Sequence, residues 1–147
     1  MCSFITINRV VANGEINLAN KYSKLRGPDL TNTVNFKGHT FVHNLLSITG
    51  KIIKQPFVDE ENEIVCVYNG EVYNFNEFGN YDSDGQCLIP LYKKHGVKFL
   101  KHLDGEFAIV LYDFKKQIIV TGSDTFSTKP LWYGVTSDEN MIFASYE

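Results

Sequence analysis

Short runs of apolar residues, bounded by turn-forming residues, dominate the pattern of hydrophobic and polar positions along this chain. Runs of this length are typical of β-strands. The pattern predicts strands at residues 4–7, 40–48, 63–68, 106–112, 117–121, 130–134 and 141–144. Residues 107–112 are apolar at every position, which indicates a strand covered on both faces and therefore a layered core.

Helical spacing is clearest between residues 84 and 95. Ser83 and Gln86 have the spacing of a capping box, apolar residues then recur with a helical period, and Gly96 is a suitable C-cap. Pro90 lies inside this predicted helix, where proline costs about 3 kcal/mol or forces a kink.

Weaker signals cover two other segments. A second short helix is predicted at residues 97–103. Residues 14–39 contain several glycines and a proline, so we expect a loop there, with a helix near residues 18–25. The chain contains no repeat or low-complexity segment, and its 147 residues, 44% of them apolar, suit a single domain spanning residues 1–147.

Composition and charge narrow the classes of partner. The formal net charge is -3 and the Lys and Arg residues are scattered, so neither nucleic acid nor an anionic membrane is an expected partner. The chain has no apolar run near the roughly 20 residues that span a bilayer. It begins without the charged segment of a secretion signal. We therefore expect a cytoplasmic protein that binds a small molecule or another protein.

The three cysteines, Cys2, Cys66 and Cys87, have neither the number nor the spacing of a disulfide framework or a zinc site. The four histidines are not spaced for a metal either, so the sequence implies no metal and no cofactor. Cys66 and Cys87 lie in apolar strand and helix patterns, which predicts buried packing residues.

Cys2 differs from the other cysteines because it follows the initiator methionine. A small second residue permits removal of Met1, and the mature chain would then begin with Cys2. An N-terminal cysteine carries a thiol and an α-amine whose pKa is about 7.7–8.0, so one residue can supply both nucleophile and general base. A cysteine at this position is a weak signal by itself, and the rest of the chain decides its significance.

Several motifs accompany Cys2 in one order along the chain. They are Met1-Cys2-Ser3, Arg26-Gly27-Pro28-Asp29, Tyr68-Asn69-Gly70-Glu71-Val72-Tyr73-Asn74, Ser83-Asp84, Leu103-Asp104-Gly105-Glu106-Phe107-Ala108 and Lys129-Pro130-Leu131-Trp132-Tyr133. Together they resemble the glutaminase domain of asparagine synthetase B and related class II glutamine amidotransferases, over essentially the whole chain. The resemblance implies an α+β fold, the four-layer αββα sandwich of N-terminal-nucleophile hydrolases.

The resemblance also implies a mechanism and a set of site residues. Cys2 attacks the side-chain amide of glutamine, its α-amine relays protons, and water hydrolyses the resulting thioester. The Asn69 side chain and the Gly70 backbone N–H stabilise the oxyanion, and Asp84 holds the substrate α-ammonium. The remaining implied substrate-binding residues are Glu71, Ser47 and Arg26.

Three of these assignments have a structural alternative. Asn69-Gly70 is also a favoured hairpin turn. Asp84 also suits the first turn of a helix, where acids interact favourably with the helix dipole. The Arg26-Gly27-Pro28-Asp29 motif is a loop that an ion pair can brace, and for it we favour the structural role.

The most informative departure from the family pattern is Leu45, which stands where the family usually has an arginine that binds the glutamine α-carboxylate. Loss of such charge-assisted hydrogen bonds costs about 1.5–3 kcal/mol each, which predicts weaker binding of free glutamine. Either another cation substitutes or the substrate is a related amide without a free α-carboxylate. The candidate cations are Arg26, Lys51 and Lys54.

Two other departures concern the end of the chain. Ser123 and Ser127 replace the Arg and Gly of the family's Arg-Asp-x-x-Gly-x-Lys-Pro segment. The chain ends at Glu147 without the ATP-binding domain of asparagine synthetases, so we expect a separate synthetase-like partner subunit to receive the ammonia.

The sequence therefore predicts an amidohydrolase of the glutaminase type that acts on glutamine or a related amide. The alternative is a non-catalytic binding or regulatory subunit with the same fold, for which Leu45 is the best evidence. The presence of Cys2, Asn69, Gly70 and Asp84 together favours the enzyme, because a purely structural protein has no physical need for that combination.

Overall fold

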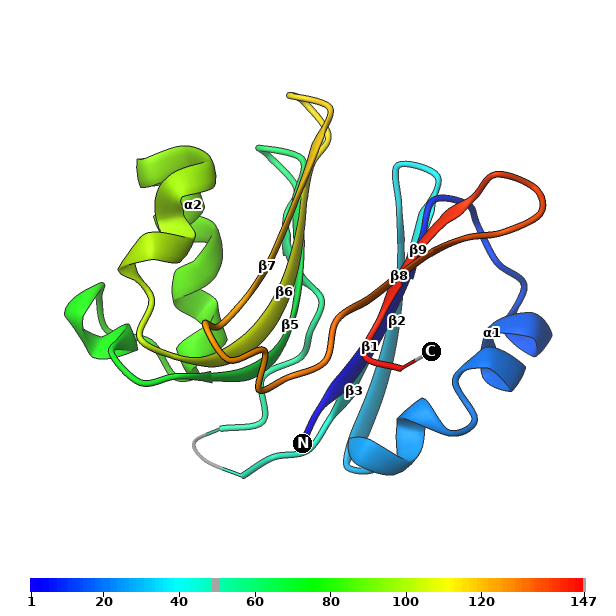
Figure 1. Ribbon diagram of the computed structural model, residues 1–147, viewed down its shortest axis with the longest axis horizontal. Helices are drawn as coiled ribbons and strands as arrows, with labels where there is room; N and C mark the ends of the chain where they lie inside the picture. The colour runs from blue at the N-terminus through cyan, green and yellow to red at the C-terminus, as the bar shows by residue number, and fades with distance from the viewer. Residues whose placement is uncertain (49–50, 147) are drawn as a thin grey trace.

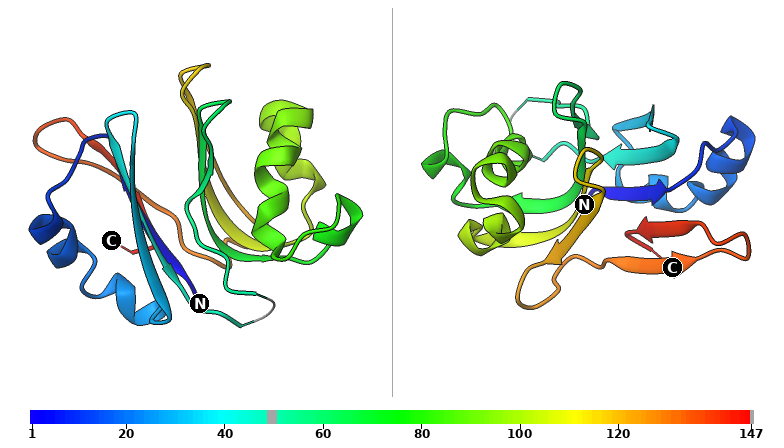
Figure 2. Two further views of the ribbon diagram at one scale, coloured as in Figure 1. Left: turned by 180° about the vertical axis from the view of Figure 1, so that it is seen from behind. Right: turned by 90° about the horizontal axis from the view of Figure 1, so that it is seen from above.

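The computed structural model of the protein describes residues 1–48 and 51–146. Within these ranges the chain forms two antiparallel sheets that pack face to face, each covered on its outer side by helices (Figures 1 and 2). The strand order is β2-β3-β1-β9-β8 in the first sheet and β4-β5-β6-β7 in the second.

The first sheet consists of β1 (Ser3–Ile7), β2 (Leu30–Phe36), β3 (His39–Leu45), β8 (Trp132–Val135) and β9 (Met141–Ala144). The second consists of β4 (Phe57–Asp59), β5 (Ile64–Val72), β6 (Gly105–Asp113) and β7 (Ile118–Ser123). Strand β1 pairs with both β3 and β9, so the first residues of the chain start from the middle of a sheet. The N-terminus lies at one end of the sandwich (Figure 1).

Helices form the two outer layers. The outer face of the first sheet is covered by α1 (Asn13–Ala19) and the 3₁₀ helix η1 (Ser23–Arg26). The outer face of the second is covered by α2 (Leu88–His95), which continues the 3₁₀ helix η3 (Asp84–Cys87) and leads into η4 (Gly96–His102). A further short turn, η2 (Phe75–Glu77), follows β5.

A hydrophobic cluster fills each of the three gaps between layers. Alternate residues of β5 divide between two of these clusters, because successive side chains of a strand point to opposite faces. Cys66 and Tyr68 face the helices, whereas Val65 and Val67 face the first sheet. The third cluster includes Ile16 of α1. This arrangement confirms the predicted four-layer sandwich, and Cys66 is buried as expected, like Cys87.

Each predicted strand is present, and all but β9 have shifted ends. The segment predicted at residues 40–48 ends at Leu45, and residues 46–48 leave the sheet. The segment predicted at 63–68 continues to Val72. The hydrophobic pattern missed β2 and β4: β2 alternates exposed with half-buried positions and contains Thr and Asn residues, so it carries too few apolar side chains to stand out from a loop.

The predicted helix at residues 84–95 is present, and its capping box between Ser83 and Gln86 is confirmed. Pro90 does not lie in the interior of one continuous α-helix, as the sequence pattern suggested. The chain turns first as the 3₁₀ helix η3, and Pro90 is the third residue of α2, in the first turn, where a helix has no acceptor for its N–H groups. The second predicted helix is η4. The helix expected near residues 18–25 is instead α1, which ends at Ala19, followed by η1.

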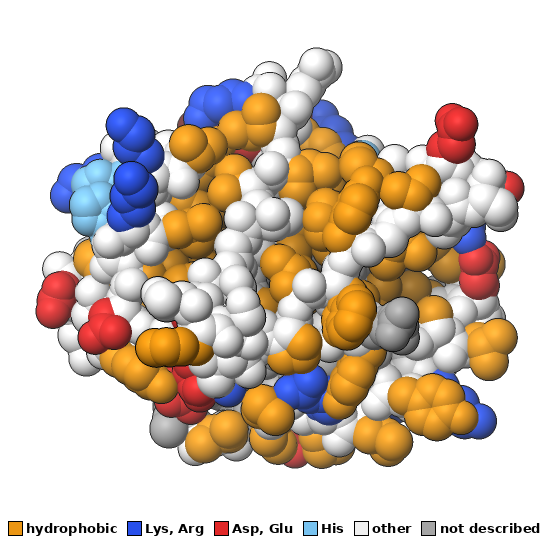
Figure 3. Space-filling view, in the orientation of Figure 1, with side chains coloured by type: hydrophobic (Ala, Val, Ile, Leu, Met, Phe, Trp, Pro, Cys, Tyr) orange, Lys and Arg blue, Asp and Glu red, His pale blue; other side chains and the backbone are white. Residues whose placement is uncertain are grey.

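On the face shown in Figure 3, Lys and His side chains lie together at the C-terminal end of α2. His95 and His102 stack there with ring centroids 4.1 Å apart. Among the described residues, no helix is long and apolar enough to cross a membrane.

Candidate active site

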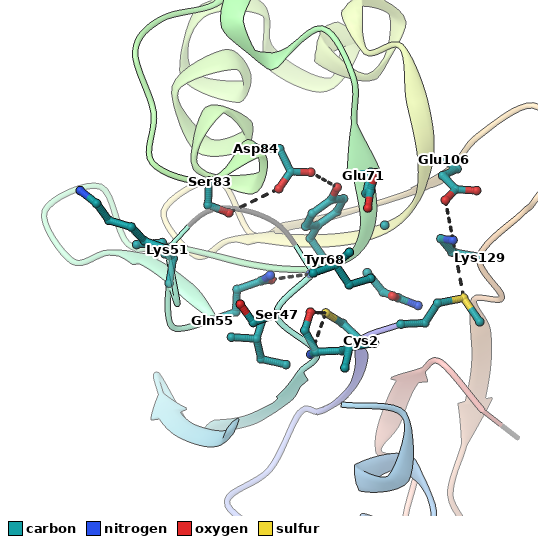
Figure 4. A pocket seen from close by; sticks show the side chains of 17 residues that line it. Cys2, Ser47, Lys51, Gln55, Tyr68, Glu71, Ser83, Asp84, Glu106 and Lys129 are labelled. Carbon is teal, nitrogen blue, oxygen red and sulfur yellow. Dashed lines mark hydrogen bonds and ion pairs between the residues drawn. The ribbon is translucent and has the colours of Figure 1, made fainter. Parts of the chain in front are cut away.

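A pocket of about 140 Å³ opens beside the N-terminus, where segments distant in the sequence meet (Figure 4). Residues 1–2 enter it ahead of β1, residues 45–48 follow the end of β3, residues 68–71 belong to β5, and residues 83–84 begin η3. The pocket therefore contains most of the residues that the resemblance implies, including Cys2, Ser47, Asn69, Glu71 and Asp84.

The Cys2 thiol is partly buried at the floor of this pocket. Its Sγ atom accepts a hydrogen bond from the Leu46 backbone N–H at 3.4 Å and lies 3.7 Å from the Leu46 carbonyl oxygen. Burial raises the pKa of Cys2, and the Leu46 backbone opposes that effect only in part. The thiol is therefore protonated near neutral pH, and its use as a nucleophile needs a nearby base.

Met1 precedes Cys2 and contributes its own side chain to the pocket lining. Its sulfur lies 3.0 Å from an Arg26 guanidinium nitrogen and 3.6 Å from Nζ of Lys129. With Met1 attached, the nitrogen of Cys2 is a peptide amide and cannot act as a base. Removal of Met1 would convert it to an amine and clear part of the pocket.

Asn69 is buried in β5, yet neither its Nδ2 nor its Oδ1 atom has a hydrogen-bond partner among the described residues. It shares strand parity with Val65 and Val67, so its side chain points toward the first sheet, which carries Cys2. An unpaired buried amide costs about 1–3 kcal/mol. Such an amide is suited to a group that enters the pocket from outside.

Gly70 lies inside β5, opposite Phe107 of β6. The hairpin-turn alternative for Asn69-Gly70 is therefore wrong. The backbone of Gly70 has φ = 151°, a conformation that favours glycine, and a Cβ atom there would overlap the Glu106 carbonyl oxygen. Only glycine allows the two strands to approach so closely beside the pocket.

Asp84 is held by donors from two elements. Its Oδ2 atom accepts hydrogen bonds from the Tyr68 hydroxyl at 2.5 Å and from the Val72 backbone N–H at 2.8 Å. Ser83 also donates to Oδ1, at 3.3 Å. All three donors are neutral, so none of them contributes a positive charge beside this carboxyl group. Asp84 is also the first residue of η3, so the helix-terminus role and the pocket role coexist.

The Arg26-Gly27-Pro28-Asp29 loop lies beside the pocket. Arg26 does not line the pocket, and its guanidinium stacks 4.9 Å from the Tyr146 ring centre. Among the described residues no ion pair joins Arg26 to Asp29, so that expectation was wrong; Asp29 accepts a hydrogen bond from the Ser47 backbone N–H at 2.8 Å instead. A side chain at Gly27 would overlap the Asn44 carbonyl, so the loop packs directly on β3.

Two of the cations proposed to substitute at the Leu45 position are outside the pocket lining, namely Arg26 and Lys54. Leu45 and Lys51 line it. Sequence reasoning missed another cation, Lys129, which is buried at the pocket edge and forms an ion pair with Glu106 at 2.8 Å. Its place in the Lys129-Pro130 motif was the available signal.

Comparison with known proteins decides the family. The family model described as a glutamine amidotransferase domain matches residues 1–147. The chain belongs to the glutamine amidotransferase family.

This amidotransferase domain is similar to much longer proteins. It is 33% identical over 128 residues to the amidase chyE of Penicillium rubens, covering 80% of this chain and 19% of that protein. It is 35% identical over 131 residues to asparagine synthetase (glutamine-hydrolyzing) 1 of Saccharomyces cerevisiae, covering 82% of this chain and 23% of that protein. The chain thus spans about a fifth of the length of these relatives.

Solved structures support the fold of the amidotransferase domain independently. The B. subtilis glutamine phosphoribosylpyrophosphate amidotransferase, in complex with ADP and GMP, superposes with a TM-score of 0.71 at 16% identity. The match covers 98% of this chain and 42% of that one. The predicted N-terminal-nucleophile sandwich is therefore confirmed.

Sequence reasoning gave no role to two residues that line the pocket of the amidotransferase domain. Tyr68 opens the Tyr68-Asn69-Gly70 motif but was given no role of its own, although its hydroxyl binds Asp84. Gln55 lies outside every predicted element, yet it is buried, lines the pocket, and accepts a hydrogen bond from the Tyr68 backbone N–H at 3.2 Å.

Proposed function

We propose that this domain hydrolyses the side-chain amide of glutamine or a closely related amide, with Cys2 as the nucleophile after Met1 has been removed. The observation that carries the proposal is the arrangement of one pocket. It combines the Cys2 thiol, the unpaired amide of Asn69 and the Asp84 carboxylate held by neutral donors.

The proposed reaction begins with proton transfer within Cys2. Because burial raises the pKa of the thiol, attack needs a base, and a free α-amine with a pKa of about 7.7–8.0 supplies one in the same residue. The Sγ atom bonds to the amide carbon as the amine takes the thiol proton. The amine returns that proton to the departing nitrogen, ammonia leaves, and a thioester remains. Water then cleaves the thioester to a carboxylic acid and the free thiol.

Charge that develops on the amide oxygen requires donors already in place. The Nδ2 group of Asn69 is a buried donor with no partner among the described residues, so an oxyanion would satisfy it without disrupting another bond. The Gly70 backbone N–H is the second proposed donor. Loss of one such donor typically lowers the rate about 10²- to 10³-fold.

Substrate orientation is assigned to the acidic side of the pocket. Asp84 is fixed by the Tyr68 hydroxyl and the Val72 N–H, so its carboxylate can accept an additional charge-assisted hydrogen bond from a substrate ammonium. Glu71 lines the same pocket and adds a second negative charge, while Ser47 lies with Cys2 on the facing side (Figure 4). Arg26 is proposed to act indirectly, through the packing of its loop.

The ammonia is proposed to pass to an acceptor on a synthetase-like partner. Relatives named glutamine-hydrolyzing asparagine synthetases extend well beyond the aligned region, which supports an acceptor site outside residues 1–147. Size-exclusion chromatography of the protein from its native source tests this idea. Elution with a larger protein that stimulates ammonia release is expected, whereas elution only as a free monomer contradicts a stable partner.

The decisive test of the catalytic proposal uses intact-mass analysis after incubation with the glutamine analogue 6-diazo-5-oxo-norleucine. We expect a chain that begins with Cys2 and carries one adduct, and no adduct on the Cys2→Ala variant. Cys66→Ala is the matched control, because Cys66 is fully buried and should leave labelling unchanged. Retention of Met1 in the native protein would contradict the mechanism. A processed but unlabelled Cys2 would point to a different substrate, a missing partner or the binding-subunit alternative, to which Leu45 in the pocket lining gives its main support.

A further inference from the structure

Negative charge in the pocket is not neutralised by the protein. Asp84 accepts hydrogen bonds from the neutral groups of Tyr68, Val72 and Ser83 and forms no ion pair among the described residues. Glu71 lies opposite Glu106 across β5 and β6, and Lys129 pairs with Glu106 rather than with Glu71. The described part of the pocket therefore presents two carboxylates that a ligand cation can satisfy.

The two basic residues of the pocket lining are already paired. Lys129 is 9% exposed and its Nζ atom lies 2.8 Å from Oε1 of Glu106. Lys51 is 73% exposed, bonds to Asp82 at 2.9 Å, and extends away from Cys2 (Figure 4). Neither lysine offers an uncommitted positive charge to an anionic group of a ligand. Arg26 lies outside the pocket lining, and its guanidinium stacks on the Tyr146 ring.

An apolar wall occupies another side of the pocket. It consists of Leu45, Leu46, Ile48 and Ile53 and is called the apolar wall below. Leu46 contacts Cys2, Leu45 is half-buried, and Ile48 is 63% exposed, so the wall leads from the nucleophile to the surface. A carboxylate placed against this wall would lose water and find no cation there, only the neutral hydroxyl of Ser47 among the described side chains of residues 45–48, which is unfavourable. A neutral group would not suffer this loss.

We infer that the preferred ligand is a glutaminyl amide: a glutamine with a free α-ammonium group whose α-carbonyl is in an amide bond instead of a free carboxylate. This inference rests on the proposed function for its reaction, in which water converts the side-chain amide to an acid and releases ammonia. The ammonium binds Asp84 and Glu71, and the neutral α-amide runs along the apolar wall. The exposed end at Ile48 leaves room for whatever is attached beyond that amide.

Binding to the inactive Cys2→Ala variant tests ligand choice separately from catalysis. Calorimetric titration would compare glutamine, glutamine α-N-methylamide and N-acetylglutamine α-N-methylamide. We expect the second to bind at least about tenfold more tightly than the first, and the third, which lacks the ammonium, to bind at least about tenfold more weakly than the second. Equal or tighter binding of free glutamine overturns the inference.

Position 45 provides a matched pair of variants in the same Cys2→Ala background. Leu45→Arg adds a cation to the wall and is expected to tighten glutamine binding by about tenfold or more, without the same gain for the α-N-methylamide. Leu45→Gln adds polarity without charge and is expected to leave the preference for the amide in place. Thermal unfolding establishes that both variants fold. A similar gain for both ligands with Leu45→Arg contradicts a role for the α-carboxylate.

Ammonia release by the processed wild-type protein identifies the source of the amide. Turnover of a hexapeptide that begins with glutamine, at a rate similar to the α-N-methylamide, indicates a peptide or protein N-terminus. Turnover of the methylamide alone indicates a small molecule, and either result supports the inference. Cys2-dependent turnover that favours free glutamine overturns it. If the binding preference holds and no ammonia forms from any ligand, the inference stands and the proposed hydrolysis fails.

Discussion

The hydroxyl of Tyr68 donates a 2.5 Å hydrogen bond to Asp84, and this contact joins the middle of β5 to the start of η3. Burial raises the pKa of Tyr68, and the negative charge of Asp84 raises it further, so the hydroxyl remains a donor throughout the working pH range. Tyr68 therefore acts as a positioning residue for the carboxylate proposed to bind the substrate ammonium.

The first prediction follows from this contact. Tyr68→Phe removes one donor and leaves Asp84 with the Val72 N–H, so we expect a loss of about 1.5–3 kcal/mol in the free energy of unfolding. The Michaelis constant for the amide substrate should rise about tenfold, with a smaller change in kcat, because binding rather than chemistry loses its support. Steady-state kinetics and urea unfolding measure both effects.

The control is Tyr92→Phe, which removes the same kind of bond elsewhere. Tyr92 donates to Asp113 at 2.7 Å, and neither residue lines the pocket. This variant should lose comparable stability without a change in the Michaelis constant. If both variants alter substrate binding equally, the effect of Tyr68 is one of general stability.

The second prediction concerns the unpaired amide of Asn69. Asn69→Leu removes a buried polar group that has no partner among the described residues, so the free energy of unfolding should stay constant or rise by up to about 2 kcal/mol. The rate of ammonia release should nevertheless fall about 10²- to 10³-fold if Asn69 stabilises the oxyanion. A gain in stability together with a loss of activity is the signature of a functional polar group.

Asn44→Leu is the matched comparison for Asn69. The Asn44 side chain is also buried, but it exchanges hydrogen bonds with Ser3, Asn20 and Thr31. Its replacement should destabilise the protein by at least about 3 kcal/mol, because several buried polar groups would lose their hydrogen-bond partner. A large loss of stability in Asn69→Leu as well would show that Asn69 is structural.

The third prediction tests the close approach of β5 and β6. Gly70→Ala places a Cβ atom against the Glu106 carbonyl at a backbone conformation that favours glycine, so we expect a loss of at least about 3 kcal/mol in the free energy of unfolding. Gly14→Ala makes the same chemical change in α1, where no atom lies within 4 Å, and should stabilise the protein by up to about 1 kcal/mol. Chemical unfolding of the two variants gives the comparison.

The sequence pattern predicted those elements that are marked by a strongly apolar run or by a motif of closely spaced residues. Strand β9 begins and ends as expected, and β6 was recognised because both of its faces are apolar. The capping box at Ser83 was readable because its two partners are three residues apart. Strand β2 could not be recognised, because it is stabilised by pairing with β3 and carries alternating polar residues.

The sequence predicted only those residues of the candidate site that lie in the family motifs. The resemblance supplied Cys2, Asn69 and Asp84, and the structure places all three in one pocket. The Tyr68 contact with Asp84 and the ion pair between Lys129 and Glu106 depend on how distant segments pack. The spacing of neighbouring residues along the sequence does not reveal such contacts.

The last prediction is a dependence of stability on pH that arises from His43. This residue is buried in β3, and its Nε2 atom hydrogen-bonds to the Tyr68 carbonyl at 3.0 Å. Burial lowers the pKa of His43 from 6.5 to about 4 in the folded protein, whereas the unfolded chain binds the proton near pH 6.5. Above about pH 6.5 His43 is neutral in both the folded and the unfolded state, so it does not affect the free energy of unfolding. As the pH falls toward about 4, the unfolded chain binds a proton that the folded protein does not, and the free energy of unfolding decreases.

The full effect approaches about 3 kcal/mol at pH 4, since each pKa unit corresponds to about 1.4 kcal/mol. Urea unfolding between pH 7 and pH 4 measures this slope, and His43→Gln provides the control because its amide can donate a hydrogen bond but does not titrate. The difference in slope between wild type and variant isolates His43 from the carboxylates and from the half-buried His95, whose pKa is also lowered, first by desolvation and then by His102. Because His43 contacts the backbone of Tyr68, its protonation should also disturb the position of Asp84, and substrate binding should weaken in the same pH interval in the wild type but less in the variant. Identical slopes in the two proteins would show that His43 remains neutral in both states or charges without cost.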